Sequence, residues 1–240
     1  TGLRASTDTA EADARPRVGT DMHLLLTDRL QCPRCGPGFG LVLMTAAMTD
    51  RRVAQGYLGC ANCRERYPIE GGVADLRPAP RSALEAKQDA RPGGKPTAED
   101  PESDIPPRQF ATGLAAAMGA IEGGRPVLLF GGAVGWARHL LEVLPDDVEV
   151  VTVLASLEDA VPGTSGVIVG DAWPFPDGTL GGATLLGIDA SPKRLRTLGR
   201  LLDPRRRLVV IDPPEGIQAR LGGAGLTRFV QGPGLAAAGR

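Results

Sequence analysis

Residues 32–63 read CPRCGPGFGLVLMTAAMTDRRVAQGYLGCANC, and this stretch decides the fold of the N-terminal part of the chain. It begins with Cys32 and Cys35, ends with Cys60 and Cys63, and leaves 24 residues between the two pairs. Each Cys-x-x-Cys pair places two sulfurs on a tight turn, and two such turns supply the tetrahedral thiolate set of structural Zn²⁺ sites. The gap slightly exceeds the commonest ribbon spacing, and a β-hairpin between the turns accommodates it. We therefore expect a four-cysteine zinc ribbon.

Two other interpretations of the cysteines stay open. A pair of disulfides is disfavoured because the first twenty residues contain Asp8, Glu11 and Asp13 and lack the apolar core of a secretory signal. A redox-active Cys-x-x-Cys is disfavoured because the motif occurs twice without a thioredoxin-like βαβ pattern around it. With four protein ligands and no open position, the expected zinc ion is structural. It would supply much of the folding free energy of so small a unit.

The composition of the chain excludes some classes of protein. Its 240 residues are 42% hydrophobic, and Lys+Arg 27 against Asp+Glu 28 leave a formal net charge of -1. This balance argues against a strongly basic nucleic-acid-binding surface, although a local basic patch remains compatible with it. No apolar run approaches the roughly 18 residues that a membrane span requires. We expect a cytoplasmic protein.

Four segments are expected along the chain. Residues 1–21 are predicted to be a disordered extension, and residues 22–76 hold the zinc ribbon. Residues 77–107 contain seven prolines and no aromatic residue. Such a segment cannot bury enough apolar surface to offset its ordering entropy, so it is predicted to be a flexible linker. Residues 108–240 are predicted to form a second domain.

This second domain alternates short apolar runs with helical patterns. The runs read VLLFGG, EVVTVL, VIVGDA, GATLLGI and RLVVIDPP. After the first run, Trp136, Leu140, Leu141 and Leu144 share one face of a helix. The alternation predicts an α/β fold with a mostly parallel sheet that is covered on both faces. The last residues, AGLTRFVQGPGLAAAGR, are expected to add a hairpin that turns at Gly-Pro-Gly.

The ribbon segment resembles a known family. LLTDRLQCPRC and LGCANCRERYPIEGGVADLRP resemble the small zinc-ribbon family that activates tRNA, rRNA and release-factor methyltransferases. The resemblance covers residues 23–77 and departs at Gly71, where the family usually has an acidic residue. It implies a protein-binding role, in which residues near Val73 to Leu76 pair with a strand of the chain's own C-terminal domain or of a partner protein. A nucleic-acid-binding ribbon is the alternative, and the missing aromatic stacking platform weakens it.

The C-terminal part carries a second resemblance. VLLFGGAVGWARHLL places Gly131, Gly132 and Gly135 between a predicted strand and a predicted helix. Glycines there let the backbone approach a ligand, although a tight turn that needs glycine for packing is the alternative. Together with GDAWPFPDGTLGGATLL and LLDPRRRLVVIDPP, the segment resembles class I S-adenosylmethionine-dependent methyltransferases, which implies a Rossmann-like fold. The resemblance would make these glycines, Asp171 and Ala172 the cofactor-binding residues.

Departures from that second family affect the expected cofactor. The family usually has an acidic residue two positions before the first glycine, where this chain has Leu129. Many members also end the second strand with a carboxylate for the ribose, where this chain has Leu154 or Ala155. Each missing carboxylate removes a charge-assisted hydrogen bond of about 1.5–3 kcal/mol. The resemblance therefore implies a degenerate domain for which S-adenosylmethionine binding is doubtful.

The sequence does not identify catalytic residues. Asp212-Pro-Pro-Glu215 resembles a motif that holds an amide or amino group for methylation, but it follows the predicted fifth strand and lacks the aromatic residue. We expect a non-catalytic protein-binding, assembly or regulatory subunit. The alternatives are an active S-adenosylmethionine-dependent methyltransferase that carries its zinc-ribbon activator in cis, and a zinc-ribbon nucleic-acid adaptor.

Overall fold

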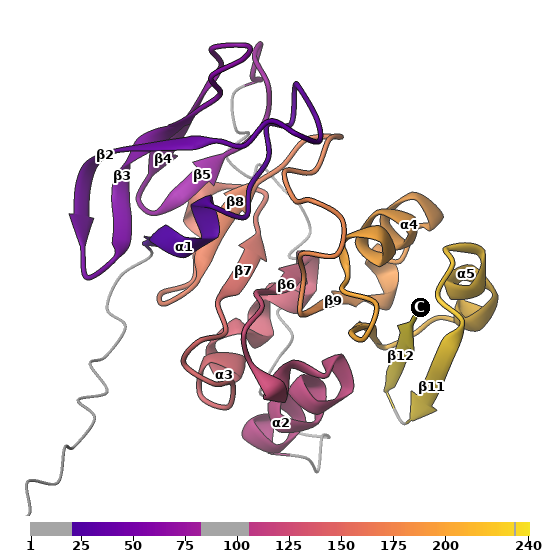
Figure 1. The fold of residues 1–240 in the computed structure, drawn as a ribbon. Helices are drawn as coiled ribbons and strands as arrows, with labels where there is room; N and C mark the ends of the chain where they lie inside the picture. The colour runs from indigo at the N-terminus through magenta and orange to yellow at the C-terminus, as the bar shows by residue number, and fades with distance from the viewer. Residues whose placement is uncertain (1–20, 83–105, 233) are drawn as a thin grey trace, which may run out of the picture.

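The computed structural model describes residues 21–82, 106–232 and 234–240. Its strands join into one twelve-stranded sheet that runs through the whole described part of the chain (Figure 1). The order is β1-β3-β4-β5-β8-β7-β6-β9-β10-β12-β11, and β2 pairs with β3 outside this path. Within the described ranges, no helix combines the length and the apolar character that crossing a membrane requires.

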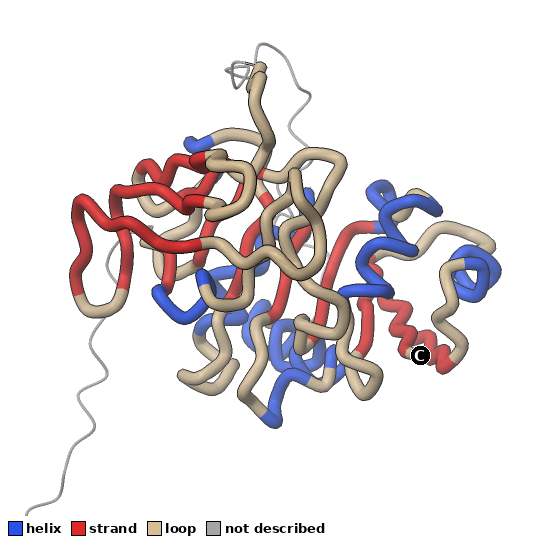
Figure 2. The backbone as a smooth tube through the Cα atoms, turned by 45° about the horizontal axis from the view of Figure 1, so that its top comes forward, coloured by secondary structure: helices blue, strands red, loops and turns tan. Residues whose placement is uncertain are grey.

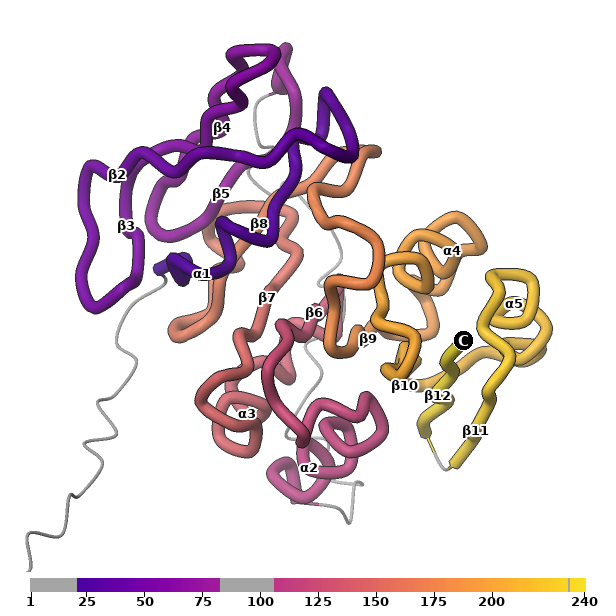
Figure 3. Tube along the Cα trace, viewed as in Figure 1, coloured from indigo at the N-terminus to yellow at the C-terminus, as the bar shows by residue number. Residues whose placement is uncertain are grey.

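Five parallel strands form the centre of the sheet. They are β6 (Val127–Phe130), β7 (Val150–Val153), β8 (Ser165–Ile168), β9 (Gly182–Leu186) and β10 (Arg207–Ile211). Counted along the chain, their spatial order is 3-2-1-4-5, so the strand order reverses between β6 and β9 (Figure 3). This is the order of a doubly wound Rossmann-like sheet. The predicted α/β fold with a mostly parallel sheet is confirmed.

A hairpin closes one end of the sheet. β12 (Leu235–Gly239) runs antiparallel to β10 and pairs with β11 (Arg228–Gly232). The predicted C-terminal hairpin is thus confirmed, while Pro233 of its turn lies outside the described residues.

Helices lie on both faces of the central sheet (Figure 2). Alternate residues of a strand point to opposite sides. In β6, Val127 and Leu129 accordingly lie in one apolar cluster with α2 and α3, whereas Leu128 lies in the other with α4 and α5. The helices are α2 (Pro107–Met118), α3 (Ala137–Leu141), α4 (Pro192–Leu201) and α5 (Ile217–Gly223). Segments of 3-10 helix lie in the connections of the described sheet domain, namely η1 (Ala120–Glu122), η2 (Gly131–Trp136), η3 (Leu157–Asp159) and η4 (Gly187–Asp189).

The N-terminal part continues the same sheet. Its elements are β1 (Met22–His23), α1 (Leu24–Thr27), β2 (Val42–Thr49), β3 (Arg52–Gly59), β4 (Arg66–Glu70) and β5 (Val73–Asp75). β5 pairs in parallel with β8, with Val73 opposite Gly166. The Leu76 N–H extends this pairing by donating to the Ile168 carbonyl at 2.8 Å. The structure therefore confirms the expected strand pairing near Val73 to Leu76, and the partner strand belongs to the chain's own C-terminal part.

The ribbon and the central sheet share one apolar core. Leu30, Tyr67 and Ile69 of the ribbon belong to the same buried cluster as Val167 of β8 and Phe175 of the loop after it. This β8–β9 loop also accepts hydrogen bonds from the ribbon residue Gln31. The Gln31 backbone N–H donates to the Pro174 carbonyl at 2.8 Å, and its side-chain amide donates to the Phe175 carbonyl at 3.1 Å. The ribbon thus covers part of the sheet face that α4 and α5 leave open.

The predicted extension and linker fall largely outside the described residues, which begin at residue 21 and omit residues 83–105. Residues 77–82 of the predicted linker do lie within them and contact the ribbon. The Arg81 guanidinium donates to the Glu65 carboxylate at 2.9 Å and to the Arg66 carbonyl at 2.7 Å. The chain therefore stays against the ribbon for several residues beyond β5.

Candidate metal centre and glycine loop

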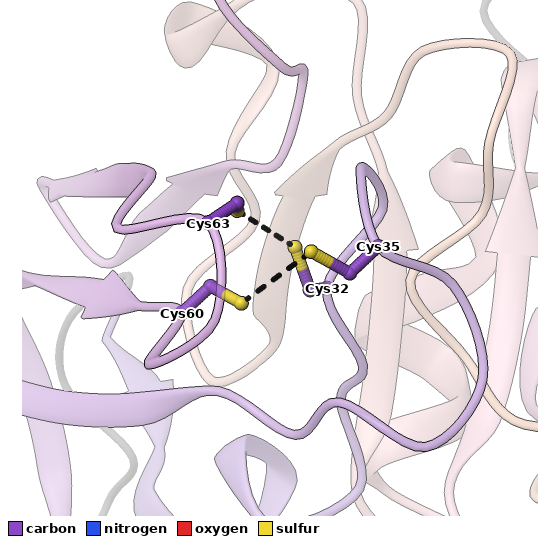
Figure 4. Close-up of side chains that lie close together, drawn as sticks. All are labelled: Cys32, Cys35, Cys60 and Cys63. Atoms are coloured by element: carbon purple, nitrogen blue, oxygen red, sulfur yellow. Dashed lines mark hydrogen bonds between the residues drawn. The ribbon is translucent and has the colours of Figure 1, made fainter.

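The four cysteines converge from two tight turns, one before β2 and one between β3 and β4 (Figure 4). Within the turns, the Gly36 N–H donates to the Cys32 carbonyl at 2.8 Å, and the Arg64 N–H donates to the Cys60 carbonyl at 2.9 Å. Gly36 and Arg64 have φ angles of 77° and 60°, so both turns end in the left-handed region. These bonds aim the sulfurs at a common centre.

The spacing of the sulfurs fits a tetrahedral metal ion. All four lie within 4.8 Å of one another, with Cys32 and Cys63 3.7 Å apart and Cys35 and Cys60 3.8 Å apart. Four sulfurs at about 2.3 Å from one Zn²⁺ would lie about 3.8 Å apart in a regular tetrahedron. A disulfide would need about 2.05 Å, and the four thiols are free. The cluster can therefore hold a zinc ion with a complete set of protein ligands.

The surroundings of the cluster favour thiolates at some positions. Burial opposes the charge of Cys60, but the backbone N–H groups of Cys63 and Asn62 outweigh it and lower the pKa of Cys60 to about 7. The backbone N–H of Glu65 favours the Cys63 thiolate, but burial and the neighbouring thiols raise the pKa of Cys63 to about 12. A bound cation would remove this conflict, because metal binding displaces the thiol protons.

Polar side chains also reach the sulfurs. The Asn62 side-chain amide donates to Cys35 Sγ at 3.3 Å. The Tyr67 hydroxyl lies 3.4 Å from Cys32 Sγ, and burial raises the pKa of Tyr67 well above its ordinary value. In the sequence, Tyr67 stands out only as part of the Tyr-Pro-Ile segment of the family resemblance, and Asn62 does not stand out. Their contacts with sulfur could not be predicted, because nothing in their spacing shows that they point at sulfur.

The glycine loop follows β6 at the carboxyl end of the sheet. Gly131 has a φ angle of 59°, and a Cβ added there would overlap the Asp189 carboxylate. A Cβ on Gly132 would overlap the Leu186 side chain, while Gly135 is exposed. The absence of a Cβ at Gly131 and Gly132 therefore lets Asp189 of η4 and Leu186 at the end of β9 pack directly against the loop backbone. The interpretation of this loop as a tight turn that needs glycine for packing fits these contacts.

Two of the three candidate positions that lack a carboxylate, Leu129 and Leu154, are buried in apolar surroundings, whereas Ala155 is exposed. Leu129 lies in the core beneath α2 and α3. Leu154, just beyond β7, packs in a cluster with Val73 of the ribbon and Ile168 of β8. Leu154, one of the two positions where the resemblance led us to expect a ribose carboxylate, therefore packs against β5 of the N-terminal part. The nearby Glu158 is exposed.

Asp171 and Ala172 lie exposed in the loop after β8. The Lys193 ammonium lies 2.7 Å from the Asp171 carboxylate and lowers the pKa of Asp171. The side chains of Asp171 and Lys193 border a pocket of about 210 Å³, which is smaller than the roughly 300–1,000 Å³ of typical ligand pockets.

Two aromatic rings and an arginine complete this pocket. Phe130 and Trp173 stack with their ring centroids 5.9 Å apart, and the Arg194 guanidinium lies 4.0 Å from the Phe130 ring centroid. Asp171 thus lines the same pocket as Phe130 at the end of β6, while the first two loop glycines lie against Asp189 and Leu186. Phe130, Trp173 and Arg194 were not predicted as site residues. For Phe130, the position of an aromatic residue directly before a glycine loop is a usable signal.

The Asp-Pro-Pro segment follows β10, the fifth parallel strand, as predicted. Asp212 has a φ angle of 49°, and its N–H donates to the Gly234 carbonyl at 2.8 Å. Its carbonyl and the Pro214 ring pack so closely on Gly187 that a Cβ there would overlap them. The segment thus holds η4, which in turn contacts the glycine loop.

No family model matches the sequence, and no curated protein matches it. Among solved structures, the chain is similar to an S-adenosylmethionine-dependent methyltransferase from Aquifex aeolicus, at 17% identity and a TM-score of 0.43, over 55% of this chain and 87% of that chain. A protein from Pyrococcus horikoshii OT3 is 16% identical, with a TM-score of 0.39 over 60% and 93% of the two chains. The phosphoethanolamine N-methyltransferase 2 of Haemonchus contortus, in complex with S-adenosyl-L-methionine, is 13% identical, with a TM-score of 0.33. The match covers 49% of this chain and 33% of that chain.

Proposed function

We propose that this chain is a non-catalytic, methyltransferase-like protein in which a structural zinc ribbon is docked permanently in cis. In this proposal it serves as a protein-binding, assembly or regulatory subunit. Residues 22–76 and 108–240 are its two units, and residues 77–107 connect them. Four reduced thiols fit the cytoplasm, where disulfides are rare.

The packing of the glycine loop at the switch point carries this proposal. In doubly wound sheets, ligands bind outside the carboxyl ends of the strands where the strand order reverses, here between β6 and β9. Asp189 and Leu186 occupy the space next to Gly131 and Gly132. These residues do not fit S-adenosylmethionine, because a ligand in the loop would have to displace a carboxylate and a leucine side chain.

Leu129, and Leu154 if it is the second acidic position, also support the proposal. Leu129 and Leu154 are buried and cannot accept a hydrogen bond from a cofactor. Two lost charge-assisted hydrogen bonds, at about 1.5–3 kcal/mol each, would weaken binding by a factor of hundreds or more. Leu154 also stabilises the ribbon through Val73, so binding a ribose there would compete with docking.

Calorimetric titration of the zinc-loaded protein with S-adenosylmethionine tests the proposal. We expect no heat of binding at millimolar ligand. The zinc content and the circular dichroism spectrum of the same sample would show that the protein is loaded and folded. Micromolar binding would overturn the proposal, whatever methyl acceptor the protein then used.

The aromatic pocket beside Asp171 favours the second candidate, an active methyltransferase with its activator in cis. Phe130 and Trp173 offer stacking surface next to an acidic side chain. The candidate requires η4 to move away from the glycine loop when the ligand binds. In the same titration, binding accompanied by a change in tryptophan fluorescence would support it over the non-catalytic proposal.

A further inference from the structure

Tyr67 is buried beside the cysteine cluster. It lies on β4 opposite Leu58 of β3, and its side chain has no exposed surface. Its hydroxyl lies 3.4 Å from the sulfur of Cys32, a cysteine that is itself fully buried. The contact therefore joins β4, which follows the turn with Cys60 and Cys63, to Cys32 of the first cysteine turn.

The direction of this hydrogen bond follows from the chemistry of the two groups. A metal-bound cysteine is a thiolate, which accepts hydrogen bonds and has no proton to donate. The Tyr67 phenol has one proton, and a buried hydroxyl without a partner would cost stability. With a metal in the cluster, the phenol must donate to the sulfur.

The Tyr67 ring is held in this orientation by residues around it. The Arg81 guanidinium lies 5.4 Å from the ring centroid and donates to Glu65 and to the Arg66 carbonyl. Glu65 also forms an ion pair at 3.3 Å with Arg34, which lies between the first two cysteines. A set of contacts thus extends from the segment after β5 to the metal centre and connects its two turns.

We infer that Tyr67 is a positioning residue of the metal centre, whose hydroxyl donates to the Cys32 thiolate and strengthens its hold on the metal. Partners that bond to metal ligands orient them, and their loss typically weakens metal affinity by about 10–100-fold. The hydrogen bond draws electron density from the sulfur, which reduces the repulsion among four thiolates around one dication. The gain in affinity comes from this reduced repulsion and from the fixed position of the sulfur. The inference rests on the zinc ribbon of the proposed function but is independent of whether the sheet domain is catalytic.

Tyr67→Phe in the full chain tests the inference, because it removes the hydroxyl and keeps the buried ring. We expect zinc affinity, measured by chelator competition, to fall by about 10–100-fold. In the Co²⁺-substituted protein, we expect the sulfur-to-cobalt charge-transfer band to move to lower energy, since the thiolate becomes more electron-rich. Tyr57→Phe is the matched control. It removes the same atom from the other tyrosine, whose ring contacts Arg66, and should change neither value.

A second measurement covers the case in which Tyr67→Phe does not fold. In the Tyr57→Phe background, fluorotyrosine incorporation labels Tyr67 alone, because the chain has only these two tyrosines. The more acidic phenol should donate more strongly and move the charge-transfer band to higher energy. Unchanged bands and affinity in the labelled protein, and in Tyr67→Phe where it folds, would overturn the inference. Failure of the parent protein to bind Zn²⁺ or Co²⁺ would instead refute the zinc ribbon itself, and the Tyr67 role with it.

Discussion

The cysteine cluster and the glycine loop both carry a ligand-binding pattern in the sequence, but the chain folds around them in opposite ways. The two cysteine turns hold four sulfurs around a space of metal size. The glycine loop packs against Asp189 and Leu186 of the same chain. One pattern leaves a space of metal size, and in the other the glycines allow close packing within the chain.

The contrast shows what each residue type can report. Four converging thiols crowd polarizable, ionisable groups together, and their geometry matches a metal far better than it matches packing. A glycine in the sequence indicates only that a neighbouring group lies too close to leave room for a Cβ, or that the backbone adopts a conformation that favours glycine. Whether that neighbour is a ligand or a side chain depends on residues distant in sequence, here those that follow β9.

Removing the metal should have the largest effect, and it tests whether the cysteine cluster supports the whole sheet. Cys60→Ser removes a buried ligand, and structural zinc contributes up to about 10–16 kcal/mol in small ribbons. Because the ribbon shares a core with β8, we expect hydrogen exchange to lose protection in β8 as well as in β5. Ala61→Ser, at an exposed position in the same turn, is the control. Intact protection of β8 in Cys60→Ser would show that the two parts are energetically separate.

The next effect concerns the surface where the ribbon meets the sheet. A Cβ on Gly166 of β8 would come 2.9 Å from both Leu154 Cδ1 and Val73 Cγ2. Gly166→Ala should therefore destabilise the protein by about 1–3 kcal/mol through overpacking, as measured by urea unfolding. Gly113→Ala adds the same atom in open space on α2 and should stabilise by about 0.5–1 kcal/mol. Equal midpoints for the two variants would argue against close packing at β5 and β8.

A smaller effect depends on pH and reports on β5 itself. Burial opposes the charge of Asp75, but the side chain and backbone N–H of Arg77 outweigh it and hold the pKa of Asp75 below its ordinary value. The resulting stabilisation is present above about pH 4 and is lost as the pH falls through the lowered pKa of the folded state. Asp75→Asn should cost about 1.5 kcal/mol at neutral pH, and the difference from the parent should shrink as the pH falls towards 3. A difference that persists in acid would assign the effect to packing.

The smallest effect tests the glycine loop by a double-mutant cycle. Gly131→Ala places a Cβ against the Asp189 carboxylate, and Asp189→Ala removes that carboxylate. We expect the double variant to recover about 1 kcal/mol relative to the sum of the single variants, as measured by urea unfolding. Additive values would mean that Asp189 is not the reason for glycine at position 131. Ligand binding would then again be a candidate explanation for that glycine.

Much of the fold could be predicted because it depends on local patterns. The apolar runs between glycines predicted the parallel strands, and the spacing of Cys32, Cys35, Cys60 and Cys63 predicted the cluster. The strand near Val73 was also predicted, through a family resemblance. Which residues pack on the glycine loop could not be predicted, because Asp189 lies 58 residues after Gly131 and carries no motif. Docking of the ribbon on the chain's own C-terminal part was one of the expected outcomes. The extent of the shared core was not predicted, because a proline-rich segment suggests a tether and says nothing about how tightly its two ends are packed.

The parallel pairing of β5 with β8 imposes an order on synthesis. All four cysteines and β5 leave the ribosome before Ser165 of β8 is made. At about 5–20 residues per second, the roughly 90 residues between them take on the order of 5–18 s. During that interval the ribbon can bind its metal and fold, but the β5 edge has no partner strand. The β5 edge is therefore available for pairing before β8 is synthesised. When β8 is made, it can pair with a β5 strand that is already folded.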